Sequence, residues 1–539
     1  MYKPEVSYDS AQNIWSSKQA PLLFPKDDSV GQIIFEVLQQ HPKKIAQISA
    51  TEGTVLTHEE LLSNSMRIAS YLRSLGLKQT DIVGIAARNT THICSVVYAC
   101  FFNGIAYHAL NWKGQQTTIE KLFAITRPRI IFCDGDEYEK IKAATEQLQV
   151  KIITMRNYPE GSIRIEELLR TPIEENFSPA RLENGNDQTL AILSSSGSTG
   201  LPKAVTARNT HGYFNECFAV TSDDIMFTNS TFDWMSGLMR SIIGGAFGAM
   251  SVIADADFDR AHVLSFLEKY KVTWCLFASG QLAQLVNCEE FEKTDLSSLR
   301  RILYGGGPCS VENQKQFRSK VQKGAMNFLY SMSEITGYGC INFYFDEKTN
   351  AVGRVTPGFQ LKIINEHGKA LGANEVGEVC HRSKQYWAGY YGDPAETSKM
   401  QDKDLWFHSG DLGYVDDDGF LYLVDRKKEM LKYINFKYYP REIEDIIAKM
   451  PGVADVCAFG IFSDEYGDEA AAVVVKMSGA QITAQDVVGY VQQHERAKHL
   501  HLHAGAIIVD DLKRLPNGKT DRKANKANFL QLKQQDALN

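Results

Sequence analysis

Short hydrophobic runs alternate with longer apolar or amphipathic segments through roughly the first half of the chain. Residues 81–86 predict a buried strand, and residues 89–103 predict a mostly apolar helix. Runs rich in isoleucine, valine and aromatic residues predict further strands at 129–133, 151–154, 189–193, 225–228, 250–253 and 272–276. Repeated strand–helix–strand units predict an α/β fold with largely parallel sheets and helices on both faces.

Three other segments have clear helix signals. The residues Thr57-His58-Glu59-Glu60 form a capping box before an apolar-periodic run, and Gly76 can end that helix. A second helix is expected at 259–270. The most hydrophobic stretch, residues 238–254, contains Arg240 and is too short to span a membrane. It therefore predicts a buried helix followed by a strand.

The pattern changes near residue 425, where a strand at 420–424 ends in the charged run Asp425-Arg426-Lys427-Lys428-Glu429. A compact α+β pattern of about a hundred residues follows, which is a typical domain size. Its helices are expected at 440–450 and 484–493, and its strands at 453–459 and 470–475. These patterns predict a large N-terminal α/β domain with layered, mostly parallel sheets (1–424), a linker (425–428) and a small α+β C-terminal domain (429–539).

Composition and charge narrow the classes of function. The 539 residues are 44% hydrophobic and 23% charged, which is ordinary for a globular protein in water. A formal net charge of −7 gives no general electrostatic reason to expect nucleic acid as a partner. The ten cysteines form no C-x-x-C pair and fit buried thiols in a reducing compartment. No hydrophobic signal peptide opens the chain and no S-K-L motif ends it, so we expect an intracellular protein of the cytoplasm or the peroxisome.

A loop rich in hydroxyl groups and glycine follows the strand at 189–193. It reads Ser194-Ser195-Ser196-Gly197-Ser198-Thr199-Gly200-Leu201-Pro202-Lys203. Clustered N–H and hydroxyl donors, glycines that allow close backbone approach and one cation suit the oxygens of a polyphosphate. The spacing differs from a Walker A motif because Leu201-Pro202 separates Gly200 from Lys203. The alternative is a polar surface loop that contains a lysine by chance.

Two further strand ends carry candidate ligand-binding residues. The first strand runs into Gly305, Gly306 and Gly307, where the backbone can lie flat against a planar ligand. The alternative is a tight turn, which needs at most one or two glycines. The second strand, at 326–329, is followed by Tyr330-Ser331-Met332-Ser333-Glu334. Its tyrosine can stack on a base, and its glutamate can bind Mg²⁺ beside phosphates.

These three segments resemble the signature motifs of the adenylate-forming superfamily, which includes acyl-CoA synthetases, 4-coumarate–CoA ligases, firefly luciferase and nonribosomal adenylation domains. Three further segments resemble its later motifs and follow in the expected order: Trp406-Phe407-His408-Ser409-Gly410-Asp411, Tyr422-Leu423-Val424-Asp425-Arg426 with Lys428 and Lys432, and Leu515-Pro516-Asn517-Gly518-Lys519. The resemblance runs from about residue 32 to residue 529 and is closest to the luciferase-like and 4-coumarate-ligase-like branch.

The resemblance implies a reaction in two steps. ATP transfers AMP to a carboxylic acid, which gives an acyl-adenylate and pyrophosphate, and a thiol then displaces AMP. It implies ATP, Mg²⁺ and coenzyme A as ligands, together with a small-molecule acid. It implies no nucleic acid, no integral membrane segment and no obligate protein partner.

The resemblance also assigns a role to each motif residue. The loop from Ser195 to Lys203 would hold the β- and γ-phosphates, and Ser333 would contact the α-phosphate. Glu334 would bind Mg²⁺, Asp411 would accept the ribose hydroxyls, and Arg426 would help to hold the ribose or the phosphates. Cations and donors are the main catalytic devices because a carboxylate attacks an already anionic phosphate.

The resemblance implies that the small C-terminal domain is mobile, because Lys519 would bridge the entering carboxylate and the α-phosphate. After adenylation this domain would rotate about a hinge near Lys428 and withdraw Lys519. A second face that contains Lys432 would then serve the thiol step. A solvated surface lysine is the alternative for Lys432.

The sequence departs from the family pattern at several positions. Asn435 stands where the family usually has a glycine in the thioester-forming face, and its side chain would narrow a pantetheine tunnel. The adenine strand reads Asn327-Phe328-Leu329-Tyr330-Ser331, without the glycines that flank the tyrosine in luciferase-like relatives, so a reshaped base pocket is expected. Ala204 replaces the usual glycine after Lys203.

The predicted acyl pocket departs most. Luciferase-like members have two histidines after a phenylalanine, whereas this chain has Asp233 and Trp234 after Phe232, followed by Met235, Leu238 and Met239. The large apolar side chains predict a medium- to long-chain fatty acid, with an aromatic, coumarate-like acid second; the alternative for Trp234 is a core residue. Other functions left open are transfer to a different acceptor, a luciferase-like oxygenation and a ligand-binding pseudoenzyme.

Four histidines near the end of the chain form a separate pattern. His499, His501 and His503 alternate, and His494 lies nearby. The alternation fits either a metal site or an exposed strand or loop. No cysteine or carboxylate completes a ligand set within that stretch, which favours the second interpretation.

Overall fold

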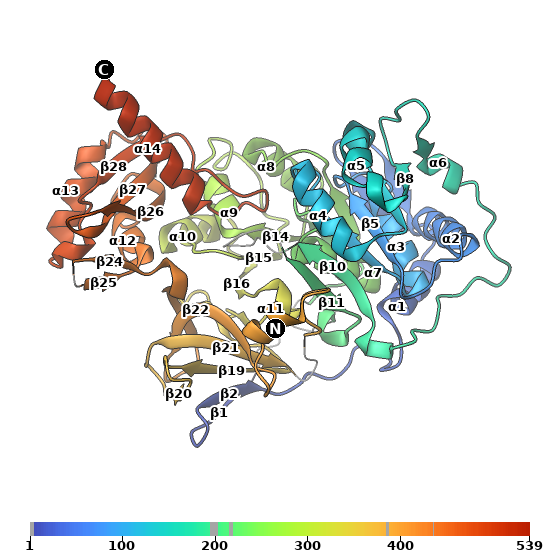
Figure 1. The fold of residues 1–539 in the computed structure, drawn as a ribbon, viewed down its shortest axis with the longest axis horizontal. Helices are drawn as coiled ribbons and strands as arrows, with labels where there is room; N and C mark the ends of the chain where they lie inside the picture. The colour runs from blue at the N-terminus through green and yellow to red at the C-terminus, as the bar shows by residue number, and fades with distance from the viewer. Residues whose placement is uncertain (1–4, 195–202, 215–218, 384–386, 435, 539) are drawn as a thin grey trace.

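The computed structural model describes residues 5–194, 203–214, 219–383, 387–434 and 436–538. In this part of the chain the strands form four sheets, three in an N-terminal domain and one in a C-terminal domain. The C-terminal domain, coloured orange to red, lies at one end of the molecule, and most of the segment coloured blue to cyan lies at the other (Figure 1). The prediction of a mixed α/β fold with two domains is confirmed.

The first sheet has seven strands in the order β11-β10-β6-β5-β7-β8-β9. It is parallel except for the pair β10–β11. Its strands are β5 (Ile82–Ala86), β6 (Ala106–Ala109), β7 (Ile130–Cys133), β8 (Lys151–Thr154), β9 (Ile163–Arg164), β10 (Thr189–Ser194) and β11 (Ala204–Arg208). The central strands are continuous apolar runs because a parallel sheet is covered on both faces.

The helices around this sheet are α2 (His58–Ser74), α3 (Ile93–Asn103), α4 (Gln116–Thr126), α5 (Tyr138–Ala144) and α6 (Ile165–Leu168). Helix α2 begins with the predicted capping box, in which the Thr57 hydroxyl accepts from the Glu60 N–H and the Glu60 carboxylate accepts from the Thr57 N–H. The predicted helix at 89–103 begins later than expected, at Ile93.

The second sheet has nine strands in the order β18-β17-β16-β15-β14-β12-β13-β3-β4, and its middle strands are parallel. Its strands are β3 (Ile45–Ser49), β4 (Val55–Thr57), β12 (Ile225–Phe227), β13 (Met250–Ile253), β14 (Trp274–Ala278), β15 (Arg301–Gly305), β16 (Ala325–Tyr330), β17 (Cys340–Ile341) and β18 (Arg354–Val355). Its helices are α1 (Val30–Gln40), α7 (Met235–Phe247), α8 (Arg260–Lys269), α9 (Ser279–Val286) and α10 (Val311–Lys320).

The largest hydrophobic core joins residues of α1, α3 and α7 with strands of both parallel sheets. All residues of α3 are buried, which explains why its sequence is apolar on every side. Helix α7 and strand β13 confirm the prediction of a buried helix followed by a strand. Arg240 on α7 is 1% exposed, and none of its guanidinium nitrogens has a hydrogen-bond partner among the described residues.

The third sheet is antiparallel and was not predicted. Its main path is β1-β2-β19-β21-β22-β23, and β20 pairs with β19. Its strands are β1 (Val6–Asp9), β2 (Ile14–Ser17), β19 (Phe359–Ile364), β20 (Ala370–Leu371), β21 (Gly377–Ser383), β22 (Phe407–Val415) and β23 (Leu421–Arg426). The strands nearest the start of the chain thus pair with a segment more than 300 residues later, as in the pair Leu361–Trp15. Helix α11 (Pro394–Met400) lies between β21 and β22 in the chain.

The C-terminal domain has a five-stranded sheet in the order β25-β24-β27-β26, with β28 beside β27. Its strands are β24 (Leu431–Tyr433), β25 (Phe436–Tyr438), β26 (Val453–Ser463), β27 (Gly467–Lys476) and β28 (Gly505–Val509). Helices α12 (Pro440–Ile447) and α13 (Ala484–His494) pack in one core, and α14 (Arg522–Leu538) packs in another through Phe529 and Phe459.

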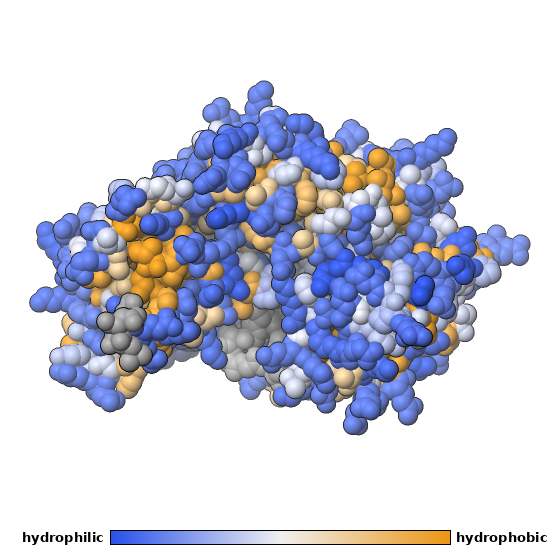
Figure 2. Space-filling model, turned by 90° about the horizontal axis from the view of Figure 1, so that it is seen from above, coloured by the Kyte–Doolittle hydropathy of each residue, from blue (hydrophilic) through white to orange (hydrophobic). Residues whose placement is uncertain are grey.

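Hydrophilic residues cover most of the face of the protein in Figure 2, and hydrophobic residues gather over the C-terminal domain and, in a smaller group, over the N-terminal domain. No helix in the described ranges is both long enough and apolar enough to cross a membrane.

Candidate active site

A cavity of about 720 Å³ lies between the N-terminal and C-terminal domains. Residues at the carboxyl ends of parallel strands line it, among them Ser194 as the last residue of β10, Tyr330 as the last residue of β16 and Gly306 directly after β15. Ligands in open α/β sheets characteristically bind at this edge, outside the carboxyl ends of the strands. The third sheet and the C-terminal domain close the cavity with Asp411, Arg426 and Lys519.

Three of the predicted ligand-binding residues form one hydrogen-bonded group. The Tyr330 hydroxyl donates to Asp411 Oδ2 at 2.8 Å, and Arg426 Nε donates to Asp411 Oδ1 at 3.1 Å. Asp411 and Arg426 face each other across the antiparallel pair β22–β23. Burial raises the pKa of Tyr330 well above its ordinary value, so its hydroxyl stays a proton donor at neutral pH. The arrangement holds the Asp411 carboxylate fixed at the wall of the cavity.

Lys519 reaches this group from the C-terminal domain. The Leu515 N–H donates to the Lys519 carbonyl at 2.8 Å, which closes a short turn around Gly518 at φ 80°. A methyl group placed on Gly306 would lie 3.0 Å from Lys519 Cε, so the glycine leaves room for this side chain. Burial and the positive charge of Arg426 lower the pKa of Lys519 to about 8, against the opposing effect of nearby carboxylates.

The loop that carries Lys519 is docked on helix α9. A methyl group placed on Gly280 would lie 2.6 Å from the Gly518 carbonyl oxygen, which is far inside van der Waals contact. Two hydrogen bonds join the domains around this contact, from Gln284 Nε2 to Asp511 Oδ2 at 2.7 Å and from Asn313 Nδ2 to the Ala454 carbonyl at 3.1 Å. The absence of a side chain at Gly280 therefore allows the close approach.

A second polar group connects Glu334 with Lys203. The Tyr390 hydroxyl donates to Glu334 Oε1 at 2.9 Å, and Lys203 Nζ lies 4.7 Å from the centre of the Tyr390 ring. Lys203 also donates to Glu396 Oε2 at 2.6 Å, and this hydrogen bond is the main reason that the pKa of Glu396 falls to about 2. No sequence motif indicated Tyr390 or Glu396, because neither belongs to a recognised signature.

Other predicted phosphate-binding residues lie outside the described residues or do not line the cavity. The loop from Ser195 to Gly200 lies outside the described residues. Ser333 lies in a turn of 3-10 helix (Ser333–Ile335) beside Glu334. Lys203, Ser333 and Glu334 are not among the described residues that line the cavity. Glu334 is nevertheless close enough to Lys519 for its negative charge to raise the pKa of the lysine. Gly306 and Gly307 line the cavity, whereas Gly305 is the last residue of β15.

The predicted acyl pocket is only partly realised. Asp233 and Trp234 line the cavity, together with Leu110, Asn111 and Ile119. Phe232 and Leu238 are instead buried in the main core, and Met235 packs against that core. The expected apolar wall is therefore smaller than predicted, because the helical turn of α7 directs Leu238 into the core.

Lys432 lies apart from these groups. It is exposed on β24, and its backbone N–H donates to Asp468 Oδ2 at 3.0 Å. It does not line the cavity in the part of the chain that the structure describes. The neighbouring Asn435 lies outside the described residues. Of the predicted linker 425–428, Asp425 and Arg426 are the last residues of β23, and Lys427 and Lys428 lie between β23 and β24. Lys428 lines the cavity.

The histidines near the end of the chain contact aromatic rings and backbone carbonyl groups. The described residues contain no group of three or more histidine, cysteine or carboxylate side chains arranged to hold a metal ion. His503 stacks on Tyr433 with ring centres 4.4 Å apart, and His499 stacks on Phe436 at 4.9 Å. His501 Nε2 is 2.8 Å from the Glu495 carbonyl oxygen.

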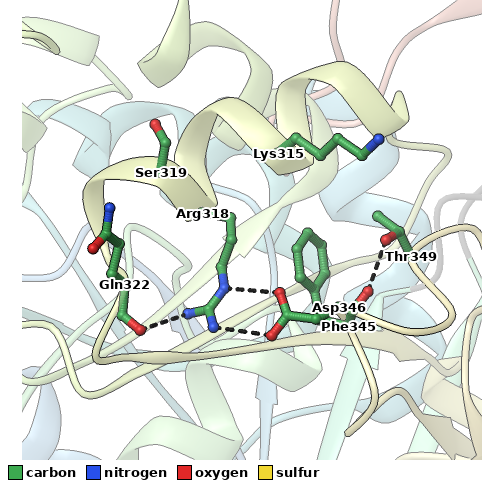
Figure 3. Close-up of a pocket in the computed structure, with 7 residues that line it drawn as sticks. All are labelled: Lys315, Arg318, Ser319, Gln322, Phe345, Asp346 and Thr349. Carbon is green, nitrogen blue, oxygen red and sulfur yellow. Dashed lines mark hydrogen bonds and ion pairs between the residues drawn. The ribbon is translucent and has the colours of Figure 1, made fainter.

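A smaller pocket of about 270 Å³ shares no residue with the cavity between the domains. In Figure 3, Arg318 points to Asp346 and forms hydrogen bonds of 3.2 and 3.0 Å with its two carboxylate oxygens. The same guanidinium donates to the backbone carbonyls of Val321, Gln322 and Gly324. Arg318 and Asp346 thus satisfy each other's charge within this pocket.

Comparison with known proteins decides the family. The AMP-binding enzyme model matches residues 34–391, and the model of the AMP-binding enzyme C-terminal domain matches residues 442–519. The chain belongs to the AMP-binding enzyme family. The resemblance that the motifs carried is therefore confirmed.

This AMP-binding enzyme is similar along nearly its whole length to acid–CoA ligases and to a luciferase. It is 26% identical to 4-coumarate:CoA ligase 1 of Petunia hybrida, over 96% of this chain and 97% of the relative. It is 27% identical to luciferin 4-monooxygenase of Photinus pyralis, over 95% of this chain and 96% of the relative. The structure of ATP-bound MatB from Rhodopseudomonas palustris shares the fold, with a TM-score of 0.81, 23% identity and coverage of 93% and 99%.

Proposed function

We propose that this protein is an ATP-dependent acyl-CoA synthetase. It would join a carboxylic acid to coenzyme A through an acyl-adenylate, with release of AMP and pyrophosphate. The observation that carries the proposal is the meeting of Lys519 from the C-terminal domain with Asp411 and Arg426 from the N-terminal domain in one cavity. Membership of the AMP-binding enzyme family supports it.

In the first step the acid attacks the α-phosphate of ATP. We assign to Lys519 the task of holding the carboxylate against the α-phosphate, since a cation there offsets the charge of both. Asp411 would accept the two ribose hydroxyls, because an ionised carboxylate can accept several hydrogen bonds. Tyr330 would stack beside the adenine, and Lys203 would exchange its pairing with Glu396 for the phosphates of ATP.

Mg²⁺ fits the residues near Glu334. One oxygen of this carboxylate accepts from Tyr390, and the described residues form no hydrogen bond with the other. Mg²⁺ is usually held by one or two carboxylates together with substrate phosphates, so a single glutamate suits an ion that arrives with ATP. There Mg²⁺ would neutralise phosphate charge, while Ser333 would donate to the α-phosphate.

The thiol step would require the C-terminal domain to change its position. Lys519 and Lys432 belong to this domain, but only Lys519 lies at the cavity. We propose that rotation near Lys428 withdraws Lys519 and brings the face with Lys432 to the acyl-adenylate. Coenzyme A would then attack the acyl carbon, and AMP would leave.

We propose a medium- to long-chain fatty acid as the first choice of substrate and an aromatic, coumarate-like acid as the second. Leu110, Ile119 and Trp234 give the acyl end of the cavity an apolar wall that suits both. The 4-coumarate:CoA ligase relative supports the aromatic choice. We propose a site of action in the cytoplasm or the peroxisome; the described cysteines are free thiols, which suits a reducing compartment.

One assay tests the proposal and its alternatives. The purified protein is incubated with ATP, Mg²⁺ and a panel of fatty and aromatic acids, with and without coenzyme A, and pyrophosphate and acyl-CoA are measured. We expect pyrophosphate with at least one acid, and acyl-CoA when coenzyme A is present. Pyrophosphate without acyl-CoA would favour another acceptor, light or oxygen uptake would favour a monooxygenase, and no pyrophosphate with any acid would favour a pseudoenzyme.

A further inference from the structure

Arg514 lies at the contact between the two domains, at the base of the turn that carries Lys519. Its side chain is 10% exposed, whereas the neighbouring Lys513 is exposed. Arg514 and Thr520 form an antiparallel bridge, and the hydrogen bond from the Leu515 N–H to the Lys519 carbonyl lies within it. The turn is therefore a small hairpin (514–520), and Arg514 lies at its open end.

The guanidinium of Arg514 donates hydrogen bonds in two directions within the C-terminal domain. Nη2 donates to Asp455 Oδ2 at 2.5 Å. Nη1 donates across the hairpin to the Gly518 carbonyl at 3.5 Å and to the Thr520 hydroxyl at 3.4 Å. The planar fork of an arginine suits several acceptors at once, whereas a lysine ammonium is a compact point charge. Arg514 thus ties the hairpin to strand β26, which contains Asp455.

The same guanidinium fills the space beside Gly280, in the first turn of α9. A methyl group added to Gly280 would overlap Arg514 Nη1 as well as press on the Gly518 carbonyl. A cation beside the first turn of a helix is electrostatically unfavourable, so this contact needs an anion to offset it. Asp455 is that anion: burial raises the pKa of its carboxyl group, and the charge and hydrogen bond of Arg514 oppose that rise.

The position of the Lys519 amine depends on this hairpin. Among the described residues no hydrogen bond or ion pair holds Nζ, and Arg426, Asp411 and Glu334 act on it only through their charges. A lysine carries its ammonium on a flexible four-carbon stem, so an amine without a partner is placed by its backbone. The anchor of the hairpin therefore decides where the amine lies in the cavity.

We infer that Arg514 is a positioning residue for acyl-adenylate formation, and that it seats the Lys519 hairpin on α9. The step that it serves rests on the proposed function. Arg514 does not line the cavity in the part of the chain that the structure describes, so it acts through Lys519. Its hydrogen-bond partners belong to its own domain and would move with it, whereas the contact with Gly280 would be lost on rotation. The effect of Arg514 is therefore confined to the first step.

Hydrogen exchange followed by mass spectrometry tests the seat on the full chain without any substrate. Arg514→Gln keeps a polar side chain but loses the charge and the fork of donors. We expect residues 514–520 to exchange about 10- to 100-fold faster than in the wild type, the value of a hydrogen bond between charged groups. The start of α9 should change in the same direction, and β27 in the middle of the C-terminal sheet should not change. Lys513→Gln, at the exposed neighbour, should match the wild type.

Single-turnover assays then connect the seat with the chemistry. With an acid that the wild type activates, Arg514→Gln should slow acyl-adenylate formation by about 10- to 100-fold. Thioester formation from supplied acyl-adenylate should stay within about threefold of the wild type. Arg514→Lys, which keeps the charge but not the fork, should be intermediate in the first step. A purely structural role would lower both rates together through loss of folded protein, which thermal unfolding would detect.

The outcomes separate this inference from the proposed function. If Arg514→Gln does not fold, Asp455→Asn decides, because it removes the counter-ion and should speed exchange of 514–520 and slow the first step. Unchanged exchange of 514–520 in a folded variant, or equal loss of both half-reactions, overturns the inference while the synthetase stands. No pyrophosphate from the wild type with any acid overturns the proposed function instead, and the exchange comparison still decides whether Arg514 seats the hairpin.

Discussion

The C-terminal domain has two faces that carry lysines, one buried against the N-terminal domain and the other exposed. The face with Lys519 is pressed into the N-terminal domain, where Gly280 and Gly306 leave room for its loop and side chain. The face with Lys432 is exposed on β24. The first face completes a cavity, and the second contributes nothing to that cavity among the described residues.

The exposed face with Lys432 carries large hydrophobic side chains. Phe462 is 70% exposed and Ile434 51%. Tyr433 and Phe436, which pair across β24 and β25 on the other side of the sheet, stack on His503 and His499. Large hydrophobic side chains gathered on a surface generally mark an interaction site. On the proposed function, this arrangement of the domains serves the first of two steps, and the four changes below test that division.

Removal of the Lys519 amine should have the largest effect. Lys519→Ala is expected to slow acyl-adenylate formation by about 10²- to 10³-fold, because a donor directed at developing charge is lost. Thioester formation from supplied acyl-adenylate should stay within about threefold, since Lys519 is withdrawn in that step by our proposal. Single-turnover assays of each half-reaction measure both. The exposed Lys513→Ala on the same loop is the matched control, and equal loss of both steps would contradict the division of roles.

A wedge in the domain contact should have the next largest effect. Gly280→Ala would place its methyl group 2.6 Å from the Gly518 carbonyl, so the docked arrangement must shift. Overpacking of this kind costs roughly 1–3 kcal/mol, which corresponds to adenylation about 5- to 150-fold slower. Thioester formation from acyl-adenylate should be nearly unchanged.

The control for the wedge is Gly489→Ala on α13, where an added methyl group meets nothing within 4 Å. Both variants should keep the wild-type melting temperature within a few degrees. If Gly280→Ala adenylates as fast as the control, the docking of the Lys519 loop on α9 is not required for the first step.

Several parts of this comparison could be predicted from the sequence, and others could not. Lys519, Asp411 and Tyr330 were recognised because each follows or belongs to a motif with characteristic neighbours. Their meeting in space depends on strand ends and a domain contact, which parallel topology suggests only for Tyr330. Glu396, which pairs with Lys203, was missed because an isolated glutamate in a helix carries no distinguishing pattern.

The antiparallel sheet and the acyl wall were also beyond sequence reasoning, for different physical reasons. The pairing of β2 with β19 joins residues that no local periodicity relates. Leu238 was expected in the pocket because it is apolar, but apolarity alone does not distinguish a core position from a pocket wall. Asp233 could be recognised more easily than Leu238, because a charged residue among apolar neighbours is unusual in a buried position.

Substitution of the lysine on the exposed face, Lys432, is expected to have a smaller effect. Lys432→Ala should slow thioester formation from acyl-adenylate by about tenfold, the value of one charge-assisted hydrogen bond, and leave adenylation intact. Lys437, which faces Lys432 across β24 and β25 and is also exposed, provides the matched control as Lys437→Ala. A wild-type rate of thioester formation in Lys432→Ala would identify Lys432 as a solvated surface residue.

The pH dependence of adenylation should give the smallest and most specific effect. Because the pKa of Lys519 is lowered to about 8, its side chain is mostly charged at pH 7 and loses its proton as the pH rises through that value. If the charged form is required, kcat/KM for ATP should fall roughly fourfold between pH 7 and pH 8.5. Lys519→Arg, which stays charged over this range, should show a flat profile even if its rate is lower. A wild-type profile that stays flat to pH 9.5, or an equal fall in Lys519→Arg, would show that adenylation does not depend on the charge of Lys519. The docked position of this side chain would then have to act in adenylation without that charge.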